Sequence, residues 1–222
     1  MSQQLKSLLN DIMASVVSGS NSRKQGKWHA SSLDKCVPMM LLDYHGISEP
    51  HGLEIHMISA VHDSVCEWIE REMLALGLNP KREYYVETDV LCGSIDILWE
   101  GGIIDVKTSN PWNFRKLKEG KNGWWDCQIE AYMRMADVEV GHVIIVDRAG
   151  GKSGSWVVRE VHRDDKVWDK AMVKVLTCQQ CLESGDMSSA VPFDCSCNSA
   201  VSSYCKIGNV DEFIAAVKEA LV

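Results

Sequence analysis

Apolar side chains recur every three or four residues over much of this chain, a spacing that predicts amphipathic helices. The predicted helices cover residues 3–17, 53–76, 125–135, 164–182 and 210–221. Gly77 is expected to end the second of these, because glycine readily adopts the left-handed backbone found after a helix. A shorter helix is predicted after Ser31 and Ser32, which can cap it, with Pro38 confined to its first turn or kinking it.

Strand patterns alternate with these helices. Runs rich in β-branched and aromatic residues predict strands over residues 82–90, 141–146 and 155–161. Two further runs rich in Ile and Val flank Gly101-Gly102, which predicts a β-hairpin, because glycine adopts the positive φ angles that a two-residue turn requires. With this turn, Asp96 is expected to lie opposite Lys107.

The period-2 alternation of strand side chains predicts two different faces for the hairpin. The apolar face points into a core and carries Ile95, Ile97, Trp99, Ile104 and Val106. The other face carries Asp96, Asp105 and Lys107, which brings two carboxylates and an ammonium group together. Acidic residues are poor strand formers, so this pair needs a cause. The set favours a divalent-metal site with a cation beside it; the alternative is a surface salt bridge.

The order of elements predicts an α/β (α+β) layered fold, and 222 residues suffice for one domain with a sizeable core. The net charge of −8 argues against a nonspecific nucleic-acid coat. One local stretch is nevertheless basic and is flanked by tryptophans: Arg115, Lys116, Lys118 and Lys121, with Trp112, Trp124 and Trp125. Such a stretch suits a DNA backbone with bases stacked on rings, or else it is a solvated loop beside core tryptophans.

The hairpin carries two motifs of a known family. Asp96 followed by Asp105-Val106-Lys107 resembles the signature of the PD-(D/E)XK nuclease superfamily, with Asp at the second acidic position. The run 93–96, Gly-Ser-Ile-Asp, resembles the G-x-x-D motif of its RecB-like branch. The signature alone occurs by chance in many proteins, so the resemblance depends on further motifs in the right order.

Two such motifs flank the hairpin. His62 resembles the upstream histidine of the RecB-like branch, which contributes a metal ligand; the alternative is a structural histidine. Gln128 and Tyr132 resemble its Q-x-x-x-Y motif, and side chains four residues apart share one helix face. A polar helix face would explain this pair as well. The four motifs together make the resemblance specific, and it covers roughly residues 30–205.

The resemblance implies a restriction-endonuclease-like core with a central mixed β-sheet flanked by helices. It implies that His62, Asp96 and Asp105 bind Mg²⁺ or Mn²⁺, with the Val106 carbonyl as a further ligand. Carboxylate oxygens suit these hard ions, and a histidine ligand favours manganese somewhat. Glu87 precedes the hairpin and is a further carboxylate for this site.

The implied function is a metal-dependent DNA exonuclease acting on single-stranded or resected duplex ends in recombination, repair or replication. Lys107 would position the attacking water or stabilise the phosphate oxygens, and Gln128 and Tyr132 would orient Lys107 or the scissile strand. The alternatives are a structure-specific endonuclease on the same core and a non-catalytic DNA-binding adaptor in a recombination or CRISPR-adaptation complex.

Nine cysteines in a chain without a secretory signal need a reason other than disulfides. Five of them crowd into residues 178–205, which suggests a metal or iron–sulfur site. The RecB-like branch includes Cas4-type exonucleases and phage relatives that hold a 4Fe-4S cluster with one N-terminal and three C-terminal cysteines. The resemblance implies that the corresponding ligands are Cys36, Cys195, Cys197 and Cys205.

The C-terminal pair departs from the family pattern, because it reads C-x-C rather than C-x-x-C. Cys178 and Cys181 have the commoner spacing and are alternative ligands. Four thiolates also suit Zn²⁺. The cluster would join residues 29–45 to residues 178–208. The remaining cysteines in predicted elements are interpreted as small core residues: Cys66, Cys92 and Cys127.

The expected organisation is an N-terminal helix and linker over residues 1–28, a nuclease domain over 29–208 and a C-terminal helix over 209–222. The expected partners are DNA ends and a recombination protein, with oligomerisation left open. No apolar run approaches a membrane span, and no secretory signal is present, so the expected location is the cytoplasm, or the host cytoplasm for a phage-encoded protein.

Overall fold

A computed structural model describes residues 26–47, 53–119, 125–149, 155–188 and 202–221. The predicted helix over residues 3–17, Cys195 and Cys197 lie outside this part of the chain. The strands are β1 (Trp28–His29), β2 (Lys81–Glu87), β3 (Leu91–Trp99), β4 (Gly102–Ser109), β5 (Val140–Asp147) and β6 (Trp156–His162). The helices are η1 (Ala30–Ser32), α2 (Val37–Tyr44), α3 (Leu53–Ala75), α4 (Pro111–Lys118), α5 (Asp126–Met135), α6 (Asp165–Ser184), η2 (Ser202–Lys206) and α7 (Val210–Ala220).

The six strands form one mixed sheet in the order β1-β3-β4-β5-β6, with β2 paired to β3 off this path. Strand β4 runs parallel to β5, and β1 runs parallel to β3, whereas the other pairs are antiparallel. A central mixed sheet flanked by helices was predicted and is confirmed. None of the described helices is both long enough and apolar enough to cross a membrane.

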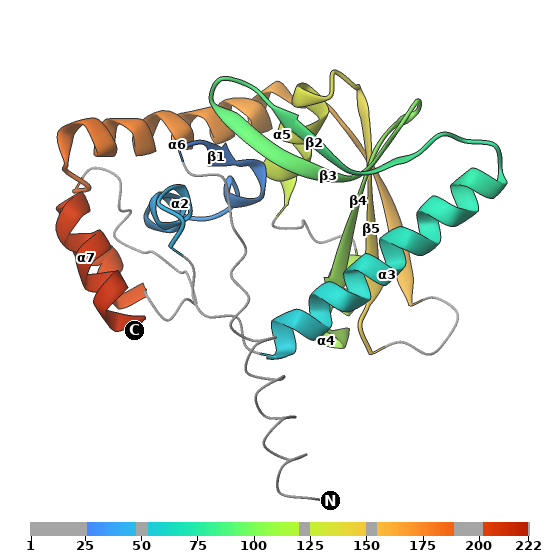
Figure 1. Ribbon diagram of the computed structural model, residues 1–222, viewed down its shortest axis with the longest axis horizontal. Coiled ribbons are helices and arrows are strands. Elements are labelled where there is room, and N and C mark those ends of the chain that lie inside the picture. The colour runs from blue at the N-terminus through green and yellow to red at the C-terminus, as the bar shows by residue number, and fades with distance from the viewer. Residues whose placement is uncertain (1–25, 48–52, 120–124, 150–154, 189–201, 222) are drawn as a thin grey trace, which may run out of the picture.

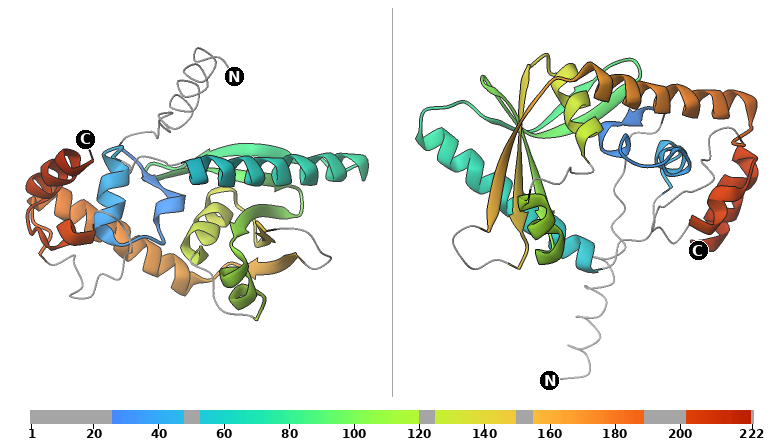
Figure 2. Two further views of the ribbon diagram at one scale, coloured as in Figure 1. Left: turned by 90° about the horizontal axis from the view of Figure 1, so that it is seen from below. Right: turned by 180° about the vertical axis from the view of Figure 1, so that it is seen from behind.

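Helices cover both faces of the sheet. The long helix α3 lies across one face, while α5 and α6 lie on the other, as the left view of Figure 2 shows. Helices α2 and α7 gather at one end of the sheet, beside β1 and the far half of α6 (Figure 1). The described chain is therefore a three-layer arrangement with a helical extension at one end.

Alternation along β4 divides the core into two parts. Ile103 packs into the large core on the α5 side, whereas Ile104 and Val106 pack into a smaller core under α3, with Cys66 and Met73. Because side chains on a strand alternate between faces, Asp105 and Lys107 lie on the same face as Ile103. The predicted separation of Ile104 and Val106 from Asp105 and Lys107 is confirmed.

One edge of β3 is shared by two strands. Its C-terminal residues 97–99 pair with β4, and its N-terminal residues 91–92 pair with β1. Neither strand pairs with residues 93–96, so β3 and β4 separate at this point and leave a gap in the sheet. The run Gly-Ser-Ile-Asp that resembles a nuclease motif is the segment that borders this gap.

The predicted hairpin register is wrong by one turn position. Trp99 pairs with Gly102, so the two-residue turn is Glu100-Gly101, and the ladder continues with Leu98 opposite Ile103. Gly102 is in the strand instead, because a Cβ there would lie 2.2 Å from the carbonyl oxygen of Val140. Glu100 therefore does not lie opposite Ile103, and extending the ladder places Asp96 level with Asp105 rather than Lys107.

The predicted face of Ile95 is also wrong. Ile97 packs under α3, but Ile95 packs into the large core on the other side. The alternation breaks between them, beside the part of β2 where Arg82 pairs with Ile97 and Tyr84 pairs with Ile95; Glu83, between these two pairs, has a φ of +50°. This left-handed backbone is unusual for a residue with a side chain and changes the direction of the strand locally.

Two other boundaries differ from the predictions for local reasons. Strand β2 ends at Glu87 rather than at residue 90, because the hydroxyl of Thr88 accepts a hydrogen bond from the Leu91 amide at 2.9 Å and closes a turn. Helix α2 is preceded by Cys36 rather than capped by serines, because the Ser32 hydroxyl donates to Asp43 instead. Pro38 lies in the first turn of α2, as predicted.

Candidate active site

Asp105 and Lys107 come from neighbouring same-face positions on β4. The Asp105 side chain is 1% exposed, and its Oδ2 lies 2.8 Å from Lys107 Nζ as an ion pair. A contact this short between an ammonium and a carboxylate favours the ionised form of Asp105. Burial raises the pKa of Asp105 to about 6, while the nearby Lys107 ammonium opposes the rise.

Helix α5 brings Gln128 and Tyr132 to the same place. Lys107 Nζ donates to Gln128 Oε1 at 2.9 Å, and Gln128 Nε2 lies 3.4 Å from both Asp105 Oδ1 and the Tyr132 hydroxyl. The predicted pair Gln128 and Tyr132 thus lies beside Lys107. Gly93 permits this approach, because a Cβ there would lie 2.7 Å from the Tyr132 ring.

The position of α5 depends on a residue far away in the sequence. Trp125, which precedes the helix, provides no side-chain cap. The Asp34 carboxylate accepts hydrogen bonds from the amides of Cys127 at 3.1 Å and Gln128 at 3.0 Å instead. An acceptor at a helix N-terminus satisfies free amides, so Asp34 fixes the start of α5 and with it the backbone of Gln128.

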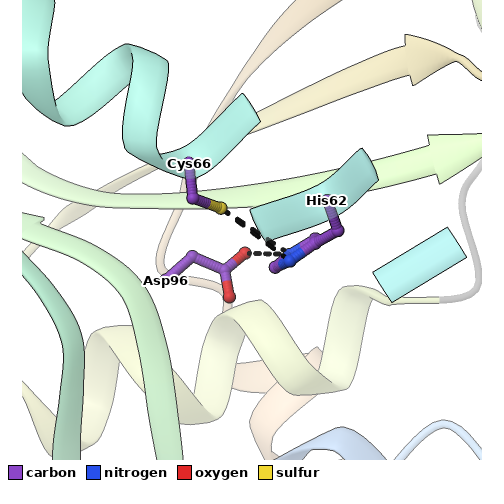
Figure 3. A group of neighbouring side chains, drawn as sticks. All are labelled: His62, Cys66 and Asp96. Carbon is purple, nitrogen blue, oxygen red and sulfur yellow. Dashed lines mark hydrogen bonds and ion pairs between the residues drawn. The ribbon is translucent and has the colours of Figure 1, made fainter. Parts of the chain in front are cut away.

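Asp96 occupies the gap between β3 and β4. Its Oδ2 accepts a hydrogen bond from the Val106 amide at 2.6 Å and lies 3.1 Å from His62 Nε2. His62 reaches it from α3, on the opposite face from α5 (Figure 3). The site is therefore assembled through the sheet, with His62 on one side and Gln128 on the other.

The hydrogen bond to Asp96 raises the pKa of His62 to about 11, and the contact with the Cys66 thiol adds to this rise. His62 is therefore an imidazolium at neutral pH, with Nε2–H directed at Asp96 and Nδ1 3.2 Å from Asp63 Oδ1. A metal ion must displace the proton on Nε2 before it can bind to this nitrogen of His62.

Sequence reasoning missed two residues at the site. Cys66 was interpreted only as a small core residue, and it is buried, but its Sγ also lies 3.8 Å from His62 Nε2. Glu83 lies opposite Asp96 on β2, and burial followed by the charge of Asp96 raises its pKa. Only the register of β2 against β3 would have identified Glu83, and the hydrophobic pattern of the sequence does not give this register.

Glu87, considered from the sequence as an additional carboxylate but not assigned to the site, has other partners. Its oxygens lie 2.5 Å from the Tyr85 hydroxyl and 3.1 Å from Lys27 Nζ. Glu83 is the β2 carboxylate that faces Asp96 instead.

The donor set at the gap fits a divalent cation. The oxygens of Asp96 and Asp105 and the ring of His62 are ligand types that Mg²⁺ and Mn²⁺ use. Asp105 Oδ2 is buried, with the Lys107 ammonium 2.8 Å away, and is a further carboxylate oxygen of the type that these ions use. The Val106 amide is bonded to Asp96; its carbonyl stays a prediction as a ligand.

The sequence left two interpretations of the basic stretch, a DNA-binding surface and a solvated loop beside core tryptophans, and different residues fit each of them. On α4, Trp112 is 65% exposed and Lys116 Nζ lies 4.9 Å from the centre of its ring. Arg115 and Lys118 are also exposed on this helix. Trp125, in contrast, is buried in the large core. Lys121 and Trp124 lie outside the described residues.

The described cysteines of the predicted cluster lie at the helical end of the molecule. Cys36 precedes α2, and the Cys178 thiol on α6 lies 4.0 Å from the carbonyl oxygen of Val37. Burial, with Cys181 and then Cys36 contributing, raises the pKa of Cys178 to about 12. Cys205 is buried in η2. Residues 29–45 and α6 are therefore adjacent, and no cluster is established by these contacts.

Similar structures share this architecture. The LHK-Exo structure in complex with dAMP matches with a TM-score of 0.57 at 15% identity over 79% of this chain and 93% of its own. A second structure of LHK-Exo, an alkaline exonuclease from Laribacter hongkongensis, matches with a TM-score of 0.54 at 15% identity over 79% and 93%. The phage-related exonuclease from Haemophilus somnus 129PT matches with a TM-score of 0.55 at 16% identity over 75% and 97%.

This chain has the fold of these exonucleases. At such low identity the likeness concerns the fold alone. A scan against protein-family models and a search of curated protein sequences found no match. The assignment of chemistry to the gap in the sheet therefore depends on the geometry of this chain's own residues.

Proposed function

We propose that the protein is a metal-dependent DNA exonuclease of the PD-(D/E)XK type, which hydrolyses phosphodiester bonds at single-stranded or resected duplex ends. Two sets of contacts on neighbouring strands support the proposal: Lys107 contacts Asp105 and Gln128, and Asp96 accepts from the Val106 amide and lies beside His62. An exonuclease fold around these contacts supports the same reading.

His62, Asp96 and Asp105 would hold Mg²⁺ or Mn²⁺, with the Val106 carbonyl as a further ligand. The ion would supply a bound water of lowered pKa and neutralise charge on the phosphate. Asp96 is held in place for this role by the Val106 amide, so its second oxygen is free to turn toward the gap. The buried Asp105 offers Oδ2 on the same side as Lys107.

Lys107 would position the attacking water or stabilise the phosphate oxygens by its charge. Its ammonium is fixed between Asp105 and the Gln128 amide oxygen, which removes most of the freedom of a long side chain. Tyr132 contacts the amide of Gln128 from the next turn of α5 and supports this arrangement. Preorganisation of this kind lowers the cost of reaching the transition state.

The test uses end-labelled linear single- and double-stranded DNA with Mg²⁺ or Mn²⁺. Asp105→Asn and Lys107→Met are each expected to reduce the degradation rate about 100-fold or more, because each removes charge at the reacting phosphate. Asp169→Asn makes the same chemical change at an exposed position on α6 and should leave the rate unchanged. Degradation that persists in both site variants would contradict the proposal.

Covalently closed circular DNA separates the alternatives. An exonuclease leaves it intact, whereas a structure-specific endonuclease cuts it at branched or single-stranded positions. DNA binding without hydrolysis of any substrate would favour the adaptor in a recombination or CRISPR-adaptation complex. Involvement of a recombination protein and oligomerisation stay predictions from the resemblance.

We further propose that Cys36, Cys195, Cys197 and Cys205 hold a 4Fe-4S cluster, with Zn²⁺ as the alternative metal and Cys178 and Cys181 as alternative ligands. The proximity of Cys36 to α6 supports a clip between the two ends of the domain. Closing so long a loop would remove entropy from the unfolded chain.

Metal content per purified chain tests this cluster. Cys36→Ser is expected to lose most of the iron and the associated visible absorbance, whereas Cys127→Ser, at another buried cysteine, should retain both. A colourless protein containing zinc would select the alternative metal. Full iron content in Cys36→Ser would contradict the ligand set.

A further inference from the structure

The third side chain in Figure 3 is a thiol beside the proposed Mg²⁺ or Mn²⁺ ligands. Cys66 lies one helical turn after His62 on α3, and residues at this spacing share one helix face. Its Sγ lies 3.8 Å from His62 Nε2, which lies 3.1 Å from Asp96 Oδ2. The ligand atoms of the three residues all lie within 4.8 Å of one another.

These separations fit a small tetrahedral ion. Zinc–ligand bonds of about 2.0–2.3 Å place neighbouring ligand atoms about 3.3–3.8 Å apart in a tetrahedron. The two contacts above lie within a few tenths of an ångström of that spacing. A thiolate is a soft ligand, which Mg²⁺ and Ca²⁺ do not favour and which Zn²⁺, Co²⁺ and Cd²⁺ do.

An open cavity leads to the thiol. A space of about 350 Å³ is lined by Asp63, Cys66, Arg82 and Glu83. Cys66 is buried, yet it borders this space, which is large enough for a hydrated cation. The guanidinium of Arg82 forms an ion pair with Glu70, at 3.7 Å. The carboxylates of Asp63 and Glu83 therefore give the cavity more hydrogen-bond acceptors than donors.

Glu83 is a further carboxylate residue that lines this cavity. It is a non-glycine residue held at a φ of +50° in the middle of a strand, next to Asp96. The conformation keeps the Glu83 carboxylate at the wall of the cavity.

We propose that Cys66, His62 and Asp96 form a binding site for a thiophilic divalent cation such as Zn²⁺, at the wall of the cavity that Glu83 also lines. His62 and Asp96 are shared with the site of the proposed function, and the inference rests on it to that extent. The two kinds of ion therefore compete, and zinc acts as an inhibitor of the Mg²⁺- or Mn²⁺-dependent reaction.

The direct test measures metal binding without DNA. Purified protein is titrated with Co²⁺, and the thiolate-to-cobalt charge-transfer absorption is recorded. Because other cysteines also bind cobalt, the decisive quantity is the difference between the wild type and Cys66→Ser. That variant is expected to lose one class of Co²⁺ site, with affinity there reduced at least tenfold, whereas Cys127→Ser keeps it.

His62→Gln gives a second reading if Cys66→Ser does not fold, because it leaves the thiol in place and removes the nitrogen ligand. It should weaken the same absorption. Spectra and affinities equal to those of the wild type in both variants would overturn the proposal.

Zinc inhibition of DNA degradation separates this inference from the proposed function. Zn²⁺ should inhibit the wild type at least tenfold more strongly than Cys66→Ser. If the protein degrades no DNA but the Cys66-dependent cobalt absorption is present, the nuclease proposal fails and the metal site stands. If DNA is degraded and the absorption does not depend on Cys66, only the metal site fails.

Discussion

Asp105 shows how a single buried charge can weaken the fold that holds it. Its pKa in the folded protein, about 6, lies above the ordinary value of 3.8, because burial disfavours the ionised form more than Lys107 favours it. The folded state therefore binds this proton more tightly than the unfolded state. The destabilisation is absent below about pH 4, grows between pH 4 and 6, and is fully present at pH 7.

Asp105→Asn should therefore stabilise the metal-free protein at pH 7 by about 1–3 kcal/mol while it abolishes activity. Thermal unfolding of wild type and variant across pH 4–7 measures this, with the difference between them growing as pH rises. Mg²⁺ or Mn²⁺ should narrow the difference, because only the wild-type carboxylate gains a cationic partner. A variant less stable than the wild type at pH 7 would contradict this account.

At the residue scale the sequence predicted which side chains of β4 share a face better than it predicted contacts between elements. Asp105 and Lys107 could be assigned to one face from alternation along a single strand, which needs no long-range information. Cys66 and Glu83 could not be assigned, because their neighbours come from other elements. The His62–Cys66 contact requires the pose of α3 on the sheet, and Glu83 requires the register of β2 against β3.

Helix α5 illustrates how one element can depend on a distant one. Its first amides are capped by Asp34, from the segment before α2. Periodicity predicted where α5 begins and ends to within a residue or two, but periodicity says nothing of a cap from so far away. The Q-x-x-x-Y pair could be placed on one helix face; its contact with Lys107 depends on where Asp34 anchors that face.

Asp34→Ala should lower stability by about 1 kcal/mol, the usual value of a lost helix cap, and should also reduce the degradation rate, because Gln128 shifts away from Lys107. Chemical denaturation and the nuclease assay together measure this. Asn209→Ala is the matched control: Asn209 caps α7 through the Glu212 amide, at the other end of the molecule. It should cost similar stability and leave the rate unchanged; an equal loss of activity in both would refute a positioning role.

For the whole molecule, a net charge of −8 makes the placement of its few basic surfaces decisive for DNA. Helix α4 carries three cations and no acidic residue, beside an exposed tryptophan. Helix α4 directly follows β4, so a DNA strand bound at Lys107 could continue along this helix. Stacking of a base on an exposed ring contributes about 1–3 kcal/mol.

Trp112→Ala should therefore weaken binding of single-stranded DNA roughly 5- to 100-fold. Fluorescence anisotropy of a labelled oligonucleotide at fixed salt measures this. Trp156→Ala removes a comparably exposed tryptophan from β6 and should have little effect. Equal effects of the two substitutions would argue against a DNA path over α4.

The layered α/β fold class could be predicted from element order, because helices and strands alternate in a way that few layered arrangements accommodate, whereas the central mixed sheet was expected from the family resemblance. The gap in the sheet could not. It arises because β3 exchanges one neighbour for another along its length, and the pairing of β1 with β3 joins segments more than sixty residues apart. The turn prediction failed for a similar reason: Gly102 is required by its approach to β5, which the hairpin sequence does not reveal.

The position of the gap between β3 and β4 also means that the proposed site is assembled only when both helical layers are in place. Because His62 arrives from one layer and Gln128 from the other, neither half of the fold carries a working centre by itself. Helix α3 packs on the sheet through the smaller core, so an opening of that core would release this helix. Release of α3 would also remove His62 from the gap. Under the proposed function, a partly folded chain would therefore not hydrolyse DNA.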